Sequence, residues 1–250
     1  MNETCDLARL DRGRSASAPP EHELWLVPRG PRGQLRGPRL SPEVVEADQR
    51  SRLLRATVSV VSDRGYRQAS VREILWQAGV SPKTAYAHFD GVDDLLLTAC
   101  EAVLDFALSE LEQAVAAQAD WSNGVREGLR RLLEYSETEP DLARCCLAEM
   151  SALGAPGEEC RVRALKRLAG ALRPAGLNAD VRRSDRMSLT DELVAGGVWH
   201  AIGAAITAER ATSVTSLLSA LHSYTVLLYE PAANTGAEAS PRSHPNAASD

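Results

Sequence analysis

Residues 78–89, with the sequence AGVSPKTAYAHF, decide the fold of this chain. Gly79 can adopt the left-handed conformation that ends a helix. Ser81 can cap the following helix, and Pro82 suits the first turn of that helix. The stretch therefore predicts a helix, a tight turn and a second, very short helix.

The preceding sequence supplies two further helices. Ser70 is a candidate cap for residues 71–78, VREILWQA, in which apolar residues recur at helical spacing. Residues 44–64 form a longer amphipathic pattern, and Gly65 ends it. Because helices of about eight residues are not stable in isolation, we expect these three helices to share one core.

The short final helix presents mostly polar side chains. We expect Lys83, Thr84 and Ala87 to point away from the core, whereas Tyr86 and Phe89 anchor the helix. An exposed helix of this kind is typical of the recognition helix of a helix-turn-helix, which enters the major groove of DNA. An ordinary helical hairpin with well-formed caps is the alternative.

Residues 50–97 resemble the DNA-binding domain of the tetracycline-repressor (TetR) family of transcriptional regulators. The resemblance implies an all-α protein, in which an N-terminal three-helix helix-turn-helix domain precedes a C-terminal helical domain for ligand binding and dimerisation. It rests on the joint order and spacing of Gly65, Tyr66, Ser70, Val71, Ile74, Ala78, Gly79, Val80, Ser81, Thr84, Tyr86, His88, Phe89 and Leu95.

The resemblance also implies which residues contact DNA. Lys83, Thr84 and Tyr86 are expected to face bases or nearby phosphates, and Gly79 and Pro82 shape the turn. The full set of expected DNA-binding residues is Ser70, Arg72, Ser81, Lys83, Thr84, Tyr86, His88, Arg36 and Arg39.

Three positions depart from the family pattern. Lys83 replaces a small residue, Ala85 replaces a larger aliphatic one, and Val92 stands where a phosphate-binding Lys is common. We hypothesise that Lys83 partly replaces the lost cation from within the recognition helix. A simple hydrophobic start to the next helix is the alternative explanation of Val92.

Charge is distributed unevenly along the chain. The net charge is −6, yet residues 24–92 contain 11 Lys and Arg against 6 Asp and Glu, a balance of +5. Residues 93–250 contain 14 against 23, a balance of −9. Basic character is thus confined to the part expected to bind DNA, and an acidic remainder discourages the rest from lying on the duplex.

The segment before the first helix is rich in Arg, Pro and Gly. Residues 28–40, PRGPRGQLRGPRL, include Arg36 and Arg39 and contain no acidic residue. Because Pro and Gly oppose regular structure, residues 1–40 are predicted to form a flexible arm that follows phosphates or enters a minor groove. A solvated linker is the alternative.

The remaining sequence continues in helical patterns without alternating β-branched runs. We expect a DNA-binding domain at 41–92, an effector-binding and dimerisation domain at 93–230, and a disordered tail at 231–250. The helix over 93–118 is expected to pack on both domains. The other expected helices span 122–138, 140–153, 157–172, 187–209 and 213–229.

The last two helices carry the expected dimer interface. By analogy with the family, they would form a four-helix bundle with their two-fold mates. The expected interface residues are Gly197, Ala201, Ala205, Leu217, Leu221, Tyr224 and Leu228. An internal core hairpin in a monomer is the alternative.

A small-molecule effector is implied by the resemblance, and its site is the least defined feature. Pockets are largely apolar with a few polar groups. The candidate lining residues are Tyr135, Cys145, Met150, Trp199 and His200, for each of which a core or interface position is the alternative.

Several classes of function lack sequence support. The five Cys residues lack metal-site spacing, and we predict neither a cofactor nor a structural metal. With no signal peptide and no apolar run long enough to cross a membrane, a cytoplasmic location is expected. No phosphate-binding loop, HExxH or GxSxG motif suggests an enzyme.

The predicted function is a ligand-responsive homodimeric transcriptional regulator of bacterial type, a repressor rather than an activator. It binds a palindromic double-stranded DNA operator through the major groove and is released by its effector. The alternative is a helical protein-interaction or small-molecule-binding module in which the helix-turn-helix is auxiliary.

Overall fold

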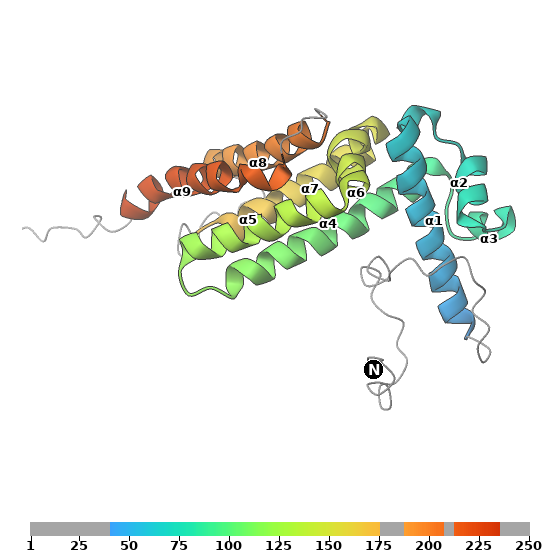
Figure 1. The fold of residues 1–250 in the computed structure, drawn as a ribbon, viewed down its shortest axis with the longest axis horizontal. Helices are drawn as coiled ribbons and strands as arrows, with labels where there is room; N and C mark the ends of the chain where they lie inside the picture. The colour runs from blue at the N-terminus through green and yellow to red at the C-terminus, as the bar shows by residue number, and fades with distance from the viewer. Residues whose placement is uncertain (1–40, 176–187, 208–212, 236–250) are drawn as a thin grey trace, which may run out of the picture.

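The structure is a computed structural model that describes residues 41–175, 188–207 and 213–235. All regular elements in these residues are helical, which confirms the predicted fold class (Figure 1). The α-helices are α1 (Pro42–Arg64), α2 (Val71–Ala78), α3 (Pro82–Tyr86), α4 (Val92–Ala116), α5 (Trp121–Thr138), α6 (Pro140–Arg144), α7 (Ala155–Leu172), α8 (Leu189–Thr207) and α9 (Leu218–Thr235). Three 3₁₀ turns (Tyr66–Gln68, Met150–Leu153, Val214–Leu217) and a π-helical segment (Cys145–Glu149) complete the described elements.

The helices form a small unit attached to one end of an elongated bundle. In Figure 1, α1 stands across the end of the bundle, and α2 and α3 lie on its outer side. The long helices α4, α5 and α7 run along the bundle, and α8 and α9 lie together on one side of it. The short helix α3 is therefore presented at one extremity of the molecule.

Helix α4 joins two buried apolar clusters. Leu96, in its first half, is fully buried with side chains of α1, α2 and α3. Leu111, in its second half, is fully buried with side chains of α5, α7, α8 and α9. The expectation that this helix packs on both parts of the protein is thus confirmed. The first cluster also takes in Cys145 and Met150, so the small unit shares its core with the body.

Helices α4 and α5 approach each other very closely. A Cβ on Gly124 would lie 2.8 Å from the carbonyl oxygen of Val115, and one on Gly128 would lie 2.7 Å from Cγ2 of Val115. Because neither position has room for a larger side chain, the two glycines set the distance between these helices.

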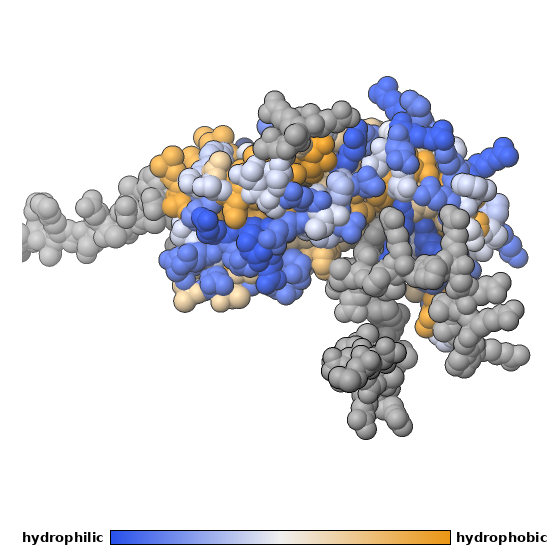
Figure 2. Space-filling view, viewed as in Figure 1, coloured by the Kyte–Doolittle hydropathy of each residue, from blue (hydrophilic) through white to orange (hydrophobic). Residues whose placement is uncertain are grey.

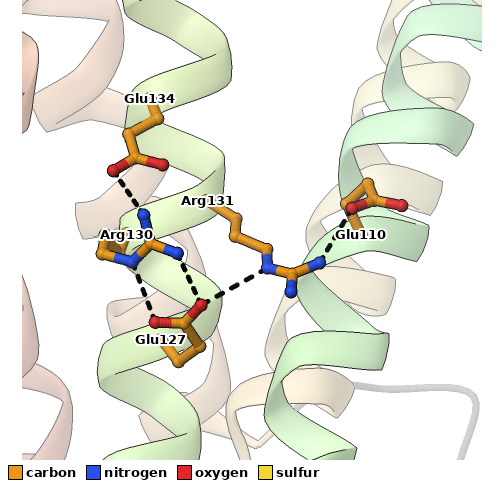
Figure 3. A network of polar contacts seen from close by, with 5 residues as sticks. All are labelled: Glu110, Glu127, Arg130, Arg131 and Glu134. Atoms are coloured by element: carbon orange, nitrogen blue, oxygen red, sulfur yellow. Dashed lines mark hydrogen bonds and ion pairs between the residues drawn. The ribbon is translucent and has the colours of Figure 1, made fainter.

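Charged side chains bridge the same two helices at the surface (Figure 3). On α5, Arg130 donates to Glu127 and Glu134, while Arg131 donates to Glu127 and reaches across to Glu110 of α4, with an Nη1 to Oε2 distance of 3.0 Å. Mainly because of the hydrogen bond from Arg130, the pKa of Glu127 is lowered to about 2. Since these side chains are partly exposed, the network orients the pair of helices more than it stabilises the fold.

Two expected boundaries differ from the structure. The helix expected over 140–153 is regular only to Arg144, continues as the π-helical and 3₁₀ segments, and ends at Gly154, where φ is +68°. Both Cys145 and Cys146 are buried in this irregular stretch. The Cys145 thiol points toward the Val58 carbonyl of α1, whereas the Cys146 thiol points toward the Cys100 carbonyl of α4. At the C-terminal end, α9 continues to Thr235, beyond the expected start of a tail at residue 231.

A buried carboxylate fixes the start of α8. Asp191 has no exposed side-chain surface, and it accepts hydrogen bonds from Arg173, from the Tyr229 hydroxyl at 2.8 Å and from the Ser188 amide at 3.2 Å. Burial alone would raise the pKa of Asp191, but these donors together outweigh it and lower the pKa. The group therefore ties the end of α7 to α8 and α9.

We predict that Asp191→Asn destabilises the protein in a pH-dependent way. Because the pKa of Asp191 is lower in the folded chain, the wild-type advantage is complete above the unfolded pKa and is lost as pH falls through the folded value. Urea unfolding at pH 7 should show a loss of about 3 kcal/mol, and the difference should shrink below about pH 4. Asp105→Asn, at an exposed ion pair, is the control. An equal loss in the free energy of unfolding at pH 7 and below about pH 4 would contradict the prediction.

Candidate DNA-binding site

The turn between α2 and α3 has the predicted geometry. Gly79 adopts the left-handed conformation, with φ 63° and ψ 36°. The Val80 amide donates to the carbonyl of Leu75 at 3.3 Å, and the Val80 side chain is buried, as in a Schellman motif. This closure satisfies carbonyl groups at the end of α2 and turns the chain directly into α3.

Both short helices are capped by serine side chains. Ser70 Oγ accepts from the Glu73 amide at 3.3 Å, and Ser81 Oγ accepts from the Thr84 amide at 3.2 Å. Pro82 occupies the first position of α3, which is only five residues long. A capping hydroxyl uses its oxygen as the acceptor, so its own O–H can still donate to a DNA phosphate.

The prediction that Tyr86 anchors α3 on the core is wrong. Ala85 and Phe89, one helical turn apart, are each 4% exposed and hold α3 on the core. Tyr86 is 59% exposed, because a residue that follows Ala85 is rotated by about 100° around the helix axis. Its exposure suits its other expected role as a DNA contact. Arg50 of α1 covers the ring of Phe89 from the other side, 4.9 Å from the ring centre.

The other expected contact residues differ in accessibility. Lys83 on α3 and Arg72 on α2 are exposed, whereas Thr84 is half-buried, with its hydroxyl 2.9 Å from that of Ser81. His88 is also half-buried, and its Nδ1 lies 3.6 Å from the Glu46 carboxylate on α1. The remaining two, Arg36 and Arg39, lie outside the described residues.

Helix α2 is fixed to α1 by polar contacts that sequence reasoning missed. Arg52 Nη1 donates to the carbonyl of Ala78 at 3.2 Å, next to the turn. Gln77 donates to Ser59 at 2.8 Å. Each pair is separated by many residues, so no local pattern could have revealed it.

A second set of contacts joins this unit to the body. The Tyr66 amide donates to Glu149 at 3.0 Å, and the Tyr66 hydroxyl donates to Asp93, at the start of α4, at 2.8 Å. Ser62 on α1 donates to Asp141 on α6 at 2.7 Å. The body therefore holds the helix-turn-helix unit through two carboxylates from the α6 region and through α4 itself.

Four of the five expected effector residues lie in or against the first core, and only His200 lies elsewhere. Cys145 and Met150 are each 1% exposed and lie in the first core, and Cys145 Sγ lies 3.6 Å from the Val58 carbonyl oxygen of α1. His200 is exposed on the outer face of α8, which corrects its assignment to an internal site. Only Tyr135 and Trp199 remain half-buried, and both pack at the first core. Burial, above all, raises the pKa of Tyr135, so this phenol stays protonated.

The expected dimer stripe also needs correction. Leu221 is 6% exposed and belongs to the second core of the chain. A Cβ on Gly197 would lie 2.8 Å from the Tyr224 hydroxyl, which donates to the Leu193 carbonyl, so the small residue accommodates α9 of the same chain. The other four stripe residues are half-buried against the second core: Ala201, Ala205, Leu217 and Leu228. The reason is that α8 and α9 are apolar on several faces, and sequence spacing does not tell which face meets the subunit's own core.

Other apolar side chains of this pair face outward. Leu193 on α8 is 49% exposed and Leu227 on α9 is 68% exposed, and His200 and Ala204 are exposed nearby in sequence on α8. Figure 2 shows apolar surface over the end of the bundle where these helices lie. This set, Leu193, His200, Ala204 and Leu227, is called the outer α8–α9 face below.

The capped turn, the exposed α3 and the helical body together define a helix-turn-helix protein. Residues 53–99 match the family model described as bacterial regulatory proteins, tetR family. The resemblance stated from the sequence is thereby confirmed: the chain carries a TetR-family DNA-binding domain.

Known proteins resemble the chain over different extents. The transcriptional activator FasR of Mycolicibacterium smegmatis is 31% identical over 105 residues, which are 42% of this chain and 46% of that protein, so the match spans about half of the relative. The fatty acid degradation regulator FadR of Bacillus halodurans has a TM-score of 0.61 at 17% identity, over 76% of this chain and 97% of that one. FadR of Bacillus subtilis, solved with stearoyl-CoA, has a TM-score of 0.59 at 17% identity, over 70% and 96%.

The matched family and these neighbours are transcriptional regulators, not enzymes, in agreement with the sequence-based prediction. In the part of the chain that the structure describes, no helix is long and apolar enough to cross a bilayer. The same residues contain no group of three or more His, Cys, Asp or Glu that could hold a metal ion.

We predict that Gly79→Ala destabilises the turn through its backbone conformation alone. The added Cβ would lie 3.7 Å from Arg52, an ordinary contact, but a left-handed conformation costs an alanine about 1–2 kcal/mol. Gly91→Ala is the matched control, because its φ of 164° is extended and a Cβ there meets nothing within 4 Å. Urea unfolding measures both variants. Equal effects at the two positions would refute this explanation.

Proposed function

We propose that this protein is a ligand-responsive transcriptional repressor that binds a palindromic operator as a homodimer. The observation that carries the proposal is the exposed, capped α3, which presents Lys83 and Tyr86 at one end of the molecule. Such a helix fits the major groove, and two copies related by a two-fold axis match two half-sites.

The outer α8–α9 face supports the homodimer. Leu193 and Leu227, like Leu189 at the start of α8, expose large apolar side chains on this pair of helices. Exposed apolar surface of this kind marks an interaction site. We propose that a second copy of this chain packs on this face, because a single recognition helix reads only one half-site.

We propose that the protein represses transcription rather than activating it. A dimer seated on an operator that overlaps a promoter excludes the polymerase without any further contact. The relative FasR is an activator, so transcription in vitro from the selected operator, with and without the protein, is the deciding measurement.

Release by an effector requires a path from the body to α3. The half-buried Tyr135 and Trp199 lie at the first core, which also contains the first half of α4. Movement there reaches the helix-turn-helix unit through α4 and through Asp141 and Glu149. Because a similar fold binds stearoyl-CoA, long-chain acyl-CoA thioesters are the first ligands to test for release of bound DNA.

Selection of bound sequences from random double-stranded DNA tests the proposal directly. The expected result is a two-fold palindrome whose half-sites are separated by about one helical turn of DNA or more. Weak binding without an enriched motif, abolished by moderate salt, would favour an auxiliary helix-turn-helix on a binding module.

We predict that Lys83→Ala weakens binding to the selected operator and lowers the salt slope of the affinity by about 1 per subunit, as expected for a lost phosphate contact. Lys166→Ala is the matched control, because it removes the other lysine of the chain at an exposed position on α7. Titrations at three salt concentrations give both quantities. An unchanged slope would show that Lys83 does not replace the cation missing at Val92.

We predict that Leu227→Glu converts the dimer into a monomer at micromolar concentration, because a charge at the centre of an apolar contact remains unpaired when buried. Gln113→Glu, which introduces the same charge at an exposed position on α4, should leave the dimer intact. Sedimentation velocity distinguishes the two species. A Leu227→Glu protein that still sediments as a dimer would place the interface elsewhere.

A further inference from the structure

Trp76 is the most exposed large apolar side chain in the described residues, at 84%. On the eight-residue helix α2, Ile74, Leu75 and Ala78 face the core, so Trp76 points directly away from it. A tryptophan in this position contributes almost nothing to its own core. It is, however, the residue type most enriched at sites that carry binding energy.

The surroundings of Trp76 are polar and basic. Residues 64–88 contain the cations Arg64, Arg67, Arg72 and Lys83 and one carboxylate, Glu73, which pairs with Arg64 at 2.8 Å. Within the described part of the chain, Arg67, Arg72 and Lys83 form no ion pair. Three positive charges of the helix-turn-helix unit that carries Trp76 are therefore available to a polyanion.

The direction of the side chain adds to this argument. Long side chains on a helix lean toward its N-terminus, and Trp76 lies on the same face of α2 as Arg72, which is one turn earlier. In a helix-turn-helix, the first helix crosses the DNA backbone while the second enters the groove. Trp76 therefore lies on the side of α2 that approaches the edge of a half-site.

A protein partner fits this surface less well. Trp and Arg are also common at protein interfaces, but Arg67, Arg72 and Lys83 form no ion pair within the described residues, and a polyanion can pair with all three. A DNA backbone combines phosphate oxygens with apolar sugar faces. An indole offers an N–H donor and an apolar ring, and it matches both.

We propose that the Trp76 indole N–H donates a hydrogen bond to a backbone phosphate at the edge of each half-site, while the ring packs against the adjoining deoxyribose. Arg72, one turn away, contacts the same backbone segment. The contact fixes the position of α2 on the duplex and carries no base information. This inference rests on the proposed DNA-binding function and adds to it a contact from outside α3.

Affinity measurements and ethylation interference on the selected operator test the proposal. Trp76→Phe removes the N–H and keeps a ring, whereas Trp76→Ala removes both. We expect binding to weaken roughly tenfold or more for Phe, as for loss of a hydrogen bond to a charged group, and further for Ala, which also loses the ring contact. The interference signal at one phosphate per half-site should disappear in both variants, and the base preferences should stay the same.

Trp121→Phe is the matched control. Its indole N–H donates to the Leu172 carbonyl at 3.1 Å, in the body, so the same chemical change occurs far from α2. This variant should lose some thermal stability but keep the wild-type operator affinity and interference pattern.

The outcomes separate this inference from the proposed function. If the wild-type protein binds no specific operator, the proposed function itself fails. If the wild type binds but both Trp76 variants keep its affinity and interference pattern, the contact proposed here does not exist. Unchanged DNA binding combined with altered transcription in vitro would also overturn it and would assign Trp76 to a protein partner.

Discussion

The structure depends on one helix that serves two cores. Leu95, Leu96 and Ala99 of α4 are buried against the helix-turn-helix unit, and Leu108 and Leu111 are buried against the body. Since protein interiors are close-packed, a shift of α4 in the body cannot be absorbed without displacing side chains at its other end. In the proposed function, this constraint is the route by which a ligand bound in the body acts on the DNA-binding unit.

The helix-turn-helix illustrates how a very short element becomes well defined. Five residues of α3 form too few backbone hydrogen bonds to persist in isolation. The left-handed Gly79, the Ser81 cap and the two buried anchors, Ala85 and Phe89, fix both ends of the helix instead. Because these interactions use the inner side and the termini, the outer side chains of α3 remain available to another molecule.

Besides the apolar core that they share, polar contacts join the unit to the body. Glu149 accepts from the Tyr66 amide, and Asp141 accepts from Ser62. The π-helical segment that ends at Glu149 has irregular backbone hydrogen bonding, a feature frequent at functional sites. Glu149 therefore joins the body to the DNA-binding unit at a second place, beside α4.

The helical class, the caps at Ser70 and Ser81, the turn at Gly79 and the family of the DNA-binding domain could all be predicted from the sequence, because each depends on residues within a few positions of one another. Other features became clear only from the packing of the helices. Tyr86 is exposed, Leu221 and Gly197 pack within the chain, Cys145 and Met150 lie in the first core, and Glu149 accepts from the Tyr66 amide. Spacing along a helix shows that an apolar face exists but not which neighbour covers it. That choice is made by the packing of helices distant in sequence, where shape and burial are settled together.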